Sequence, residues 1–291
     1  MSKILVCGLA NVETSCAVAE FPIAYSPIDY NFFGVTSSPS GVGLNVALAL
    51  TTLGDEISFL SFAADDPAGL LVREAFSAVN DSRFAPCKET PQSVVLYDKS
   101  GRRRVYTDLK DLQERTLPED LYADIADFDA CCLCNINFSR PLLERAKSAG
   151  VPVFSDVHCL SDIHDDYNAD FMRCADVLFL SNEHIAGREE DFVKGLADTY
   201  ACKVIVVGMG AKGALLYERG KGFEMIPAVQ TRQVVNTVGA GDALFSAFTH
   251  FYVKGLSAEE ALKNAALFAS YKIGESGAAK GFLTEAALLT L

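Results

Sequence analysis

Short runs of β-branched and apolar residues alternate with longer segments of helical period along most of this chain. Ile4–Gly8 and Ile57–Phe62 have the length and composition of buried strands, whereas Gly43–Leu53 and Ala258–Ile273 have those of helices. Such alternation predicts an α/β fold, with a mostly parallel sheet, helices on both faces and ligand sites at the carboxyl ends of the strands. The length of 291 residues fits one domain, which we expect to span residues 1–291.

Two segments interrupt the alternation, at about residues 10–38 and 92–109. The first has prolines, several aromatic residues and no helical period. The second has the pattern of a β-hairpin whose turn is Asp98–Gly101. Because two strand-rich insertions of this kind can pair into a small separate sheet, we expect them to form a lid over the strand ends.

Charge and composition disfavour several classes of protein. The chain has 25 Lys and Arg against 38 Asp and Glu, a net charge of −13, whereas binding to DNA or RNA requires a basic face. The apolar runs are shorter than the roughly 20 residues of a membrane span, and the first residues lack the apolar core of a signal peptide. Nine cysteines, an odd number scattered in strand-like runs, also favour a cytoplasmic protein.

The segment Val235–Asp242 carries the strongest functional signal. Three small residues, Gly239, Ala240 and Gly241, open a helix, so their N–H groups can form an anion site that the helix dipole strengthens. Asp242 follows in the first helical turn. On spacing alone it is either a helix-capping residue or a carboxylate that accepts the proton of an attacking hydroxyl beside a transferring phosphoryl group.

A second signal is Ser40–Ala47, at the start of an apolar helix. Gly41 and Gly43 could be mistaken for a dinucleotide-binding fingerprint, but the third glycine is missing and a loop precedes them where that fingerprint has a strand. Asn45 lies on an otherwise apolar helix, and a buried amide needs hydrogen-bond partners. It therefore either caps backbone groups or faces a polar ligand.

Together the two motifs resemble the signatures of the PfkB, or ribokinase-like, carbohydrate kinase family. The family's Gly-Gly-x-x-x-Asn-x-Ala appears as Ser40–Ala47, and its Asp-Thr-x-Gly-Ala-Gly-Asp appears as Asn236–Asp242. Ala64–Gly69 and Lys263–Ala266 resemble two further segments of the family. The resemblance implies a ribokinase-like three-layer fold. It also implies a kinase that transfers the γ-phosphoryl group of ATP to a hydroxymethyl group of a sugar, with Mg²⁺ present.

The resemblance further implies a role for each matching residue. Asp242 would be the general base, and the N–H groups of Gly239, Ala240 and Gly241 would hold the γ-phosphoryl group. The residues implied to bind the acceptor are Asn11, Glu13, Gly41, Gly43 and Asn45. Those implied to bind ATP are Asn182, Gly208, Gly210, Gly213, Thr237 and Asn264.

Several residues depart from the family pattern. Asn236 replaces an aspartate that helps to hold a monovalent cation in related kinases, so we expect activation by potassium to be weak or absent. The Asn-x-x-Glu element that helps to order Mg²⁺ is imperfect, because Glu183 directly follows Asn182; Glu183 is the candidate to bind the metal through water. Glu13 replaces a shorter aspartate, and Ser40 replaces a glycine.

The ring-rich segment Phe21–Phe33 leaves the acceptor open, because its rings can either pack the lid or stack on a sugar or a nucleobase. A nucleoside kinase of the same family is therefore the alternative function, and a noncatalytic sugar or nucleotide sensor is a third. An exposed lid sheet is also a liability in a soluble protein. We therefore expect a homodimer that pairs through the lids, and the candidates for its buried face are Tyr30, Phe32, Val94 and Leu96.

Overall fold

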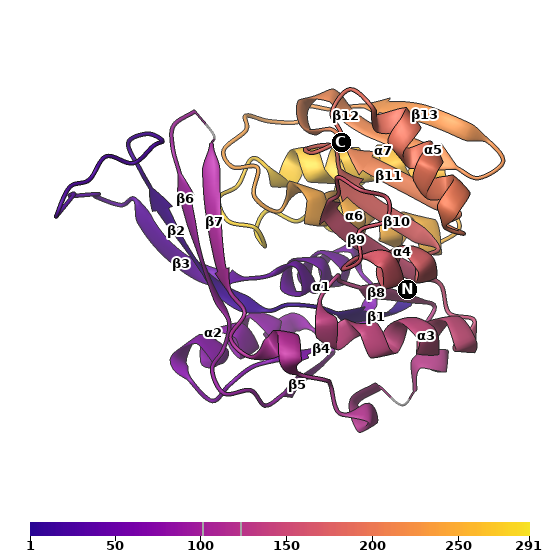
Figure 1. The fold of residues 1–291 in the computed structure, drawn as a ribbon, viewed down its shortest axis with the longest axis horizontal. Helices are drawn as coiled ribbons and strands as arrows, with labels where there is room; N and C mark the ends of the chain where they lie inside the picture. Colours follow the sequence, from indigo (N-terminus) through magenta and orange to yellow (C-terminus); the bar gives the residue numbers. More distant parts are fainter. Residues whose placement is uncertain (101, 123) are drawn as a thin grey trace.

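The computed structural model describes residues 1–100, 102–122 and 124–291. Gly101, in the turn expected at the tip of the hairpin, lies outside the described residues. The described chain forms two sheets, a large one with helices packed against it and a small one that stands beside it (Figure 1). None of the described helices combines the length and the apolar character needed to cross a membrane.

The large sheet positions the site, because most of its strands run parallel and end at one edge. In the described part of the chain it has nine strands in the order β13-β12-β11-β10-β9-β8-β1-β4-β5, with only the β11–β12 and β12–β13 pairs antiparallel. The strands are β1 (Lys3–Cys7), β4 (Glu56–Phe62), β5 (Asp81–Ala85), β8 (Ala130–Leu133), β9 (Val153–Cys159), β10 (Val177–Ser181), β11 (Val204–Gly208), β12 (Gly213–Glu218) and β13 (Gly222–Pro227). This confirms the expected mostly parallel sheet.

Helices cover both faces of the large sheet, as expected for the three-layer fold. One core contains side chains of α1 (Val42–Leu53), α2 (Pro67–Ala75), α6 (Ala240–Val253), α7 (Ala258–Lys272) and α8 (Glu285–Leu288). The other contains side chains of α3 (Arg140–Ala149), α4 (Ala169–Cys174) and α5 (Glu189–Thr199). Successive side chains of strand β1 point to opposite faces of the sheet and so pack into both cores. Ile4 and Val6 belong to the first core, and Leu5 and Cys7 belong to the second.

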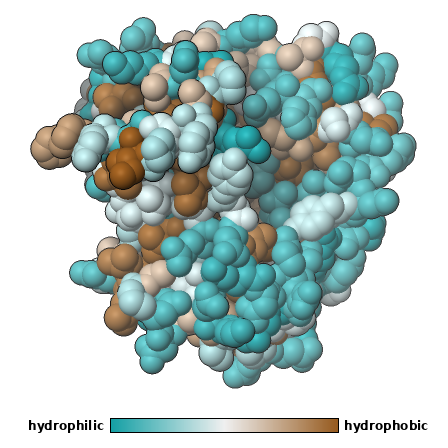
Figure 2. Space-filling model, turned by 60° about the vertical axis from the view of Figure 1, so that its left-hand side comes forward, coloured by the Kyte–Doolittle hydropathy of each residue, from teal (hydrophilic) through white to brown (hydrophobic). Residues whose placement is uncertain are grey.

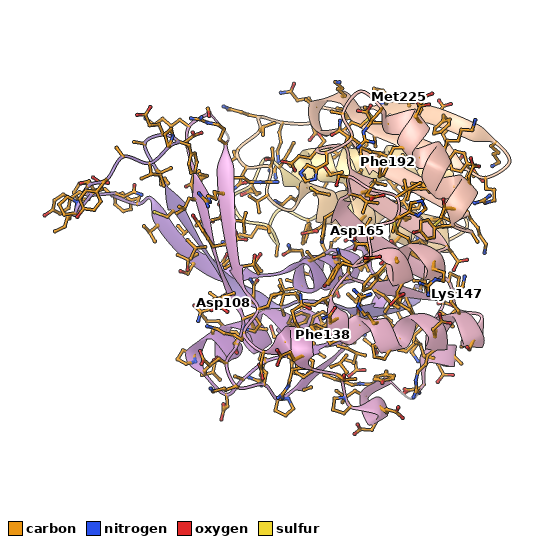
Figure 3. All side chains as sticks on the ribbon, in the orientation of Figure 1. Asp108, Phe138, Lys147, Asp165, Phe192 and Met225 are labelled. Atoms are coloured by element: carbon orange, nitrogen blue, oxygen red, sulfur yellow. The ribbon has the colours of Figure 1, made fainter. Side chains whose placement is uncertain are left out.

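The small sheet is built from the two interrupting segments, which confirms that they pair. Its described strands have the order β3-β2-β6-β7: β3 (Val35–Ser40) and β2 (Asn11–Ala17) come from the first segment, and β6 (Gln92–Tyr97) and β7 (Arg103–Asp108) from the second. The first segment continues to Ser40, two residues beyond the expected bound. Figure 1 shows the small sheet as a separate layer, and Asp108, labelled in Figure 3, lies near its base.

The two faces of the small sheet differ in character. The register of β2, β6 and β7 puts Asn11, Glu13 and Val95 on one face, where Asn11 and Val95 are buried. Val94 and Tyr106 lie opposite, and they are 41% and 49% exposed. Figure 2 shows hydrophobic residues gathered on the side of the molecule where the small sheet lies. One face of this sheet therefore contacts the body, and the other exposes Val94 and Tyr106, with the guanidinium of Arg104 4.9 Å from the Tyr106 ring centre.

The ring-rich segment between β2 and β3 extends away from the body (Figures 1 and 3). Tyr25, Tyr30, Phe32 and Phe33 are 83–102% exposed, and only Phe21 is half-buried, against the guanidinium of Arg102. The expectation that these rings pack the lid is wrong for the single chain, because the segment projects beyond the sheet and has nothing beneath it. The exposed rings are also not stacked over the residues of the candidate site.

Candidate active site

The first turns of helices α1 and α6 meet at one place. Asn45 Nδ2 donates a hydrogen bond to Asp242 Oδ2 over 2.6 Å, so the contact joins residues 197 positions apart in the sequence. Asn45 is buried and Asp242 is half-buried. Of the two uses considered for Asn45, the structure shows a side-chain partner and no backbone cap. The two motifs that carry the family resemblance therefore lie side by side.

Two glycines allow helix α1 to begin at this position. Gly41 caps the helix with a φ of 107°, a left-handed conformation that favours glycine. A Cβ on Gly43 would lie 2.6 Å from the backbone of Gly8, so α1 packs directly on the chain that leaves β1. These close approaches explain both glycines structurally, and their contact with an acceptor stays a prediction.

The turn before α6 presents unpaired N–H groups. Gly239, with a φ of 76°, is the helix cap, and a Cβ there would meet the carbonyl of Ala278 at 2.6 Å. The N–H groups of Gly239, Gly241 and Asp242 have no acceptor among the described residues. The N–H of Ala240 differs from the expectation, because it donates to the Thr237 carbonyl at 3.2 Å. The remaining donors and the helix dipole could bind an anion, and this role stays a prediction.

The electrostatics of Asp242 suit a base. Burial raises the pKa of the Asp242 carboxyl, because it disfavours the charged form. The amide of Asn45 and the ammonium of Lys272 act in the opposite direction, and the carboxylate of Asp156 adds to the increase. A carboxylate with a raised pKa is a stronger proton acceptor than a solvated one.

Two buried amide oxygens, of Asn11 on β2 and of Asn45 on α1, lack hydrogen-bond donors among the described residues. Asn11 Nδ2 donates to Ser93 Oγ over 3.0 Å, but the buried Asn11 Oδ1 receives no hydrogen bond from the described residues. The buried Oδ1 of Asn45 likewise receives no hydrogen bond from the described residues. Buried polar atoms normally have partners, so a water or a ligand hydroxyl that reaches these two oxygens would satisfy them.

Two departures from the family pattern touch each other here. Ser40 Oγ lies 3.4 Å from Glu13 Oε2 and donates to it. Burial raises the pKa of Glu13, while the hydroxyls of Ser15 and Ser40 lower it. Glu13, the longer acid, and Ser40, which replaces the glycine, are therefore hydrogen-bonded to each other.

The sequence analysis missed two polar residues at the end of β9. The N–H of His158, which has a φ of 57°, donates to Asp156 Oδ1 over 2.8 Å, and His158 Nδ1 lies 3.7 Å from Asp156 Oδ2. The Asp156 carboxylate raises the pKa of Asp242. The position of both residues in the carboxyl-terminal half of a strand of the parallel sheet is the signal that could have found them.

Lysine 272 was also missed. It lies in the last turn of α7 and its side chain is fully buried. The signal was available in the sequence, because Lys272 continues the apolar stripe of Ala261, Ala265 and Phe268 at helical spacing.

The predicted ATP residues form their contacts around β10 and β11. The backbone N–H of Asn182 donates to the Gly208 carbonyl at 3.0 Å, and its side-chain amide donates to Glu189 Oε1 at 3.0 Å. The acid bonded to Asn182 is therefore the buried Glu189, seven residues on. Glu183 is exposed and accepts from the thiol of Cys159 over 3.3 Å. A motif spacing could not have paired Asn182 with Glu189.

The other predicted ATP residues lie in turns and on α7. Gly210 and Gly213 have φ values of 56° and 109° in the turn from β11 to β12, and the Gly213 carbonyl accepts from Met209 N–H at 2.8 Å. Thr237 is exposed, and Asn264 Nδ2 donates to the Glu260 carbonyl of its own helix at 2.9 Å. The described contacts do not join these residues to Asp242.

Comparisons with known proteins identify the family. A family model described as pfkB family carbohydrate kinase matches residues 1–285. The acarbose 7(IV)-phosphotransferase of Actinoplanes sp. is 27% identical over 99% of this chain and 97% of its own length.

Two solved structures show the same fold. A microbiome-derived acarbose kinase has a TM-score of 0.87 at 23% identity, covering 100% of this chain and 98% of its own. The Arabidopsis thaliana ribokinase complexed with ribose and ATP has a TM-score of 0.82 at 21% identity, covering 99% of this chain and 98% of its own.

Proposed function

This chain belongs to the pfkB family of carbohydrate kinases and is an ATP-dependent sugar phosphotransferase, and within that class we propose that its acceptor is an uncharged sugar or glycoside with a free hydroxymethyl group. The observation that carries the proposal is the pair of buried amide oxygens, Asn11 Oδ1 and Asn45 Oδ1, that have no donor in the described structure. Sugar hydroxyls donate to such atoms. An anionic acceptor would be repelled by the carboxylates of Glu13 and Asp242 nearby.

The roles proposed for the remaining residues are those that the family resemblance implies. Asp242 accepts the proton of the attacking hydroxyl, and Asn45 orients that carboxylate through the 2.6 Å hydrogen bond. The N–H groups of Gly239 and Gly241 hold the phosphoryl oxygens as charge develops on them. Glu13 and Asn11 fix the other hydroxyls of the sugar. ATP lies along Asn182, Gly208, Gly210, Gly213, Thr237 and Asn264.

Mg²⁺ fits the acidic edge of this site. Mg²⁺ in kinases is typically held by one or two carboxylates together with phosphate oxygens and water, and the described residues contain no preformed cluster of three metal ligands. The exposed carboxylate of Glu183 is the candidate, through a bound water. When bound, the ion neutralises charge on the phosphates during transfer.

A nucleoside acceptor is less well supported than a sugar. The argument for it was the ring-rich segment, whose tip rings stand exposed and away from the body. A noncatalytic sensor is disfavoured by the intact turn of Gly239, Ala240, Gly241 and Asp242.

We propose that the protein is a homodimer through the outer face of the small sheet. Val35, Val94 and Tyr106 share that face and are 41–55% exposed, and a second copy would cover both the face and the open edges. Light scattering should give twice the chain mass. Val94→Asp with Tyr106→Asp should give the monomer, whereas Leu70→Asp, at an exposed position on α2, should not. A monomeric parent protein would refute the dimer.

We also propose that the protein works in the cytoplasm. Its nine cysteines are free thiols in the structure, and a reducing compartment that supplies ATP suits them.

A screen of ATP consumption tests the acceptor. The arms are pentoses, hexoses, glycosides, sugar phosphates and nucleosides, and each product is confirmed by mass as acceptor plus one phosphoryl group. We expect turnover with an uncharged sugar or glycoside. Faster turnover with a sugar phosphate or a nucleoside would overturn the acceptor class, and the absence of turnover with all arms would favour the sensor.

A further inference from the structure

Lys272 is a charged side chain buried where the described residues supply little solvation. It has no exposed surface, although lysine is almost never fully buried unless it is paired. Its Nζ donates to the Val238 carbonyl, and this is its one hydrogen bond to the described residues. An ammonium has three donors, so two remain for a ligand or water. Such a position requires a reason beyond packing.

Lys272 sits under the turn that opens α6. Val238, whose carbonyl it binds, immediately precedes the helix cap Gly239. Ile273, which caps the carboxyl end of α7, accepts hydrogen bonds through its carbonyl from the N–H groups of Val235 and Asn236 at 2.8 and 3.0 Å. The end of α7 therefore binds the backbone of Val235, Asn236 and Val238, in the segment that leads to the turn at Gly239.

The side chain of Asn236 completes this arrangement. Its Oδ1 accepts from the Val238 N–H at 2.8 Å, so it closes the turn on one side while Lys272 binds the carbonyl of the same residue on the other. Val238 is thus fixed through both of its backbone polar groups. The amide of Asn236 is engaged within the turn itself.

The charges around Lys272 favour a retained proton. Burial lowers the pKa of Lys272 to about 8, while the carboxylates of Asp242 on α6 and Glu13 on β2 act to raise it. The ammonium is therefore present at neutral pH. Asp156, Asp242 and Glu13 otherwise make this site acidic, and phosphate groups approach an acidic site only when a positive charge offsets it.

Resting on the proposed kinase function, we propose that Lys272 is a built-in cation of the phosphoryl-transfer site. Its ammonium fixes the Val238 carbonyl, and thereby the turn from Gly239 to Asp242, and supplies the positive charge that a free monovalent cation would otherwise bring. Lys272 is in this sense a positioning residue that acts through the turn.

Chemical rescue tests the proposal. The variants are Lys272→Ala, which removes the ammonium and leaves space, and Lys272→Met, which removes the charge and fills the space. Assays contain tetramethylammonium as the only monovalent cation, and potassium, ammonium or methylammonium is then added. Lys203→Ala is the control. Lys203 is exposed, forms an ion pair with Asp176 and immediately precedes β11, at the end of the strands opposite to the site.

We expect Lys272→Ala to lose at least roughly tenfold in kcat, somewhat less than the loss of a donor that touches the reacting oxygens. A small cation should restore part of that loss. Lys272→Met should lose as much and should not recover. The parent and the Lys203→Ala protein should keep full activity and ignore added cations.

A second readout is independent of turnover. The melting temperature of Lys272→Ala, without ATP or acceptor, should rise with added ammonium or potassium, whereas that of the parent and of Lys272→Met should not. A kcat unchanged in both variants, or a loss that no cation restores in Lys272→Ala while the melting temperature also ignores cations, would overturn the proposal. If the parent transfers phosphoryl groups to no acceptor, the proposed function fails, and the melting temperatures still decide whether Lys272 is the cation of this turn.

Discussion

Near each end of helix α6 a carboxylate lies close to a partner side chain, and the two pairs differ in their surroundings. In the first turn, Asp242 accepts from Asn45 at 2.6 Å beside unpaired backbone N–H groups, and Asn45 Oδ1 has no donor among the described residues. Near the last turn, His250 Nδ1 lies 2.7 Å from Asp55 Oδ2, with side chains only 2% and 0% exposed. The first pair lies beside backbone N–H groups that a ligand can use. The second is buried, and its His250 Nε2, which has no hydrogen-bond partner among the described residues, faces Glu285 Oε2 at 3.6 Å.

The comparison separates what serves the reaction from what serves the fold. A half-buried acid with open donors around it can bind, orient and accept a proton. A sealed pair mainly holds α6 to the segment that follows α1, since its partners are out of reach of any ligand. Substitutions at the two ends should therefore change different measurements.

The largest effect is expected at the open end. Asp242→Asn should reduce kcat by about 10²–10⁴, the range typical of general-base help. The melting temperature should be unchanged or higher, because burial disfavours the charge of this carboxyl. Steady-state kinetics and thermal unfolding check both expectations. Turnover near that of the parent would place the base elsewhere and remove the contrast between the two ends.

The sealed end should show the reverse. Asp55→Asn removes the carboxylate that His250 Nδ1 contacts in the core, and a buried hydrogen bond to a charged group contributes about 1.5–3 kcal/mol to the free energy of unfolding. At temperatures where the variant is folded, kcat and KM should match those of the parent. Urea unfolding combined with kinetics at 15 °C tests this. A selective loss of kcat without loss of stability would show that the far end of α6 also serves the reaction.

A third substitution, at Asn45, tests the open end of α6 through the pH dependence of kcat/KM. Asn45→Asp places a second carboxylate against Asp242, which should raise the pKa of Asp242 further. Since the base must be deprotonated, kcat/KM increases as the pH rises through that pKa, and the acid limb should move to higher pH. Asn45→Ala lacks the added charge and is the control. An acid limb at the same pH in Asn45→Asp and the parent would mean that another group controls it.

The smallest expected effect is a fall in kcat/KM at alkaline pH. Lys272 faces the carboxylates of Asp242 and Glu13 and the Val238 carbonyl, and its pKa is lowered to about 8. The group is charged below this pH and loses its proton above it, so kcat/KM of the parent should fall above about pH 8. Lys272→Met should have lower activity and no such limb. A limb that persists in this variant would assign it to a different group.

Much of the fold was predictable because burial imposes periodicity. The strand pattern of Ile4–Gly8 and the helical patterns of Gly43–Leu53 and Ala258–Ile273 each correspond to an element that the structure contains within about two residues. The pairing of β2 with β6 was predictable in kind, since both interrupting segments needed partners. The exposed ring-rich segment was not, because nothing in its composition tells whether a surface lies beneath it.

The site was predictable where a motif fixes the backbone, and less so where tertiary packing decides. The turn from Gly239 to Asp242 and the helix with Asn45 each carry local signals, and the contact between them follows from their shared edge of the sheet. The bond from Asn182 to Glu189 and the burial of Lys272 depend on how elements pack, which no local pattern records. Lys272 offered one clue, a lysine within an apolar stripe.

The sequence separation of Asn45 and Asp242 also sets the interval between their synthesis on the ribosome. A ribosome adds about 5–20 residues per second, and 197 residues separate the two partners, so Asp242 is made on the order of 10–40 s after Asn45. During that interval the nascent chain already has Asn11, Glu13 and Asn45 but has neither the proton acceptor nor the turn that holds phosphate. The order of synthesis therefore withholds phosphate transfer until almost the whole chain exists.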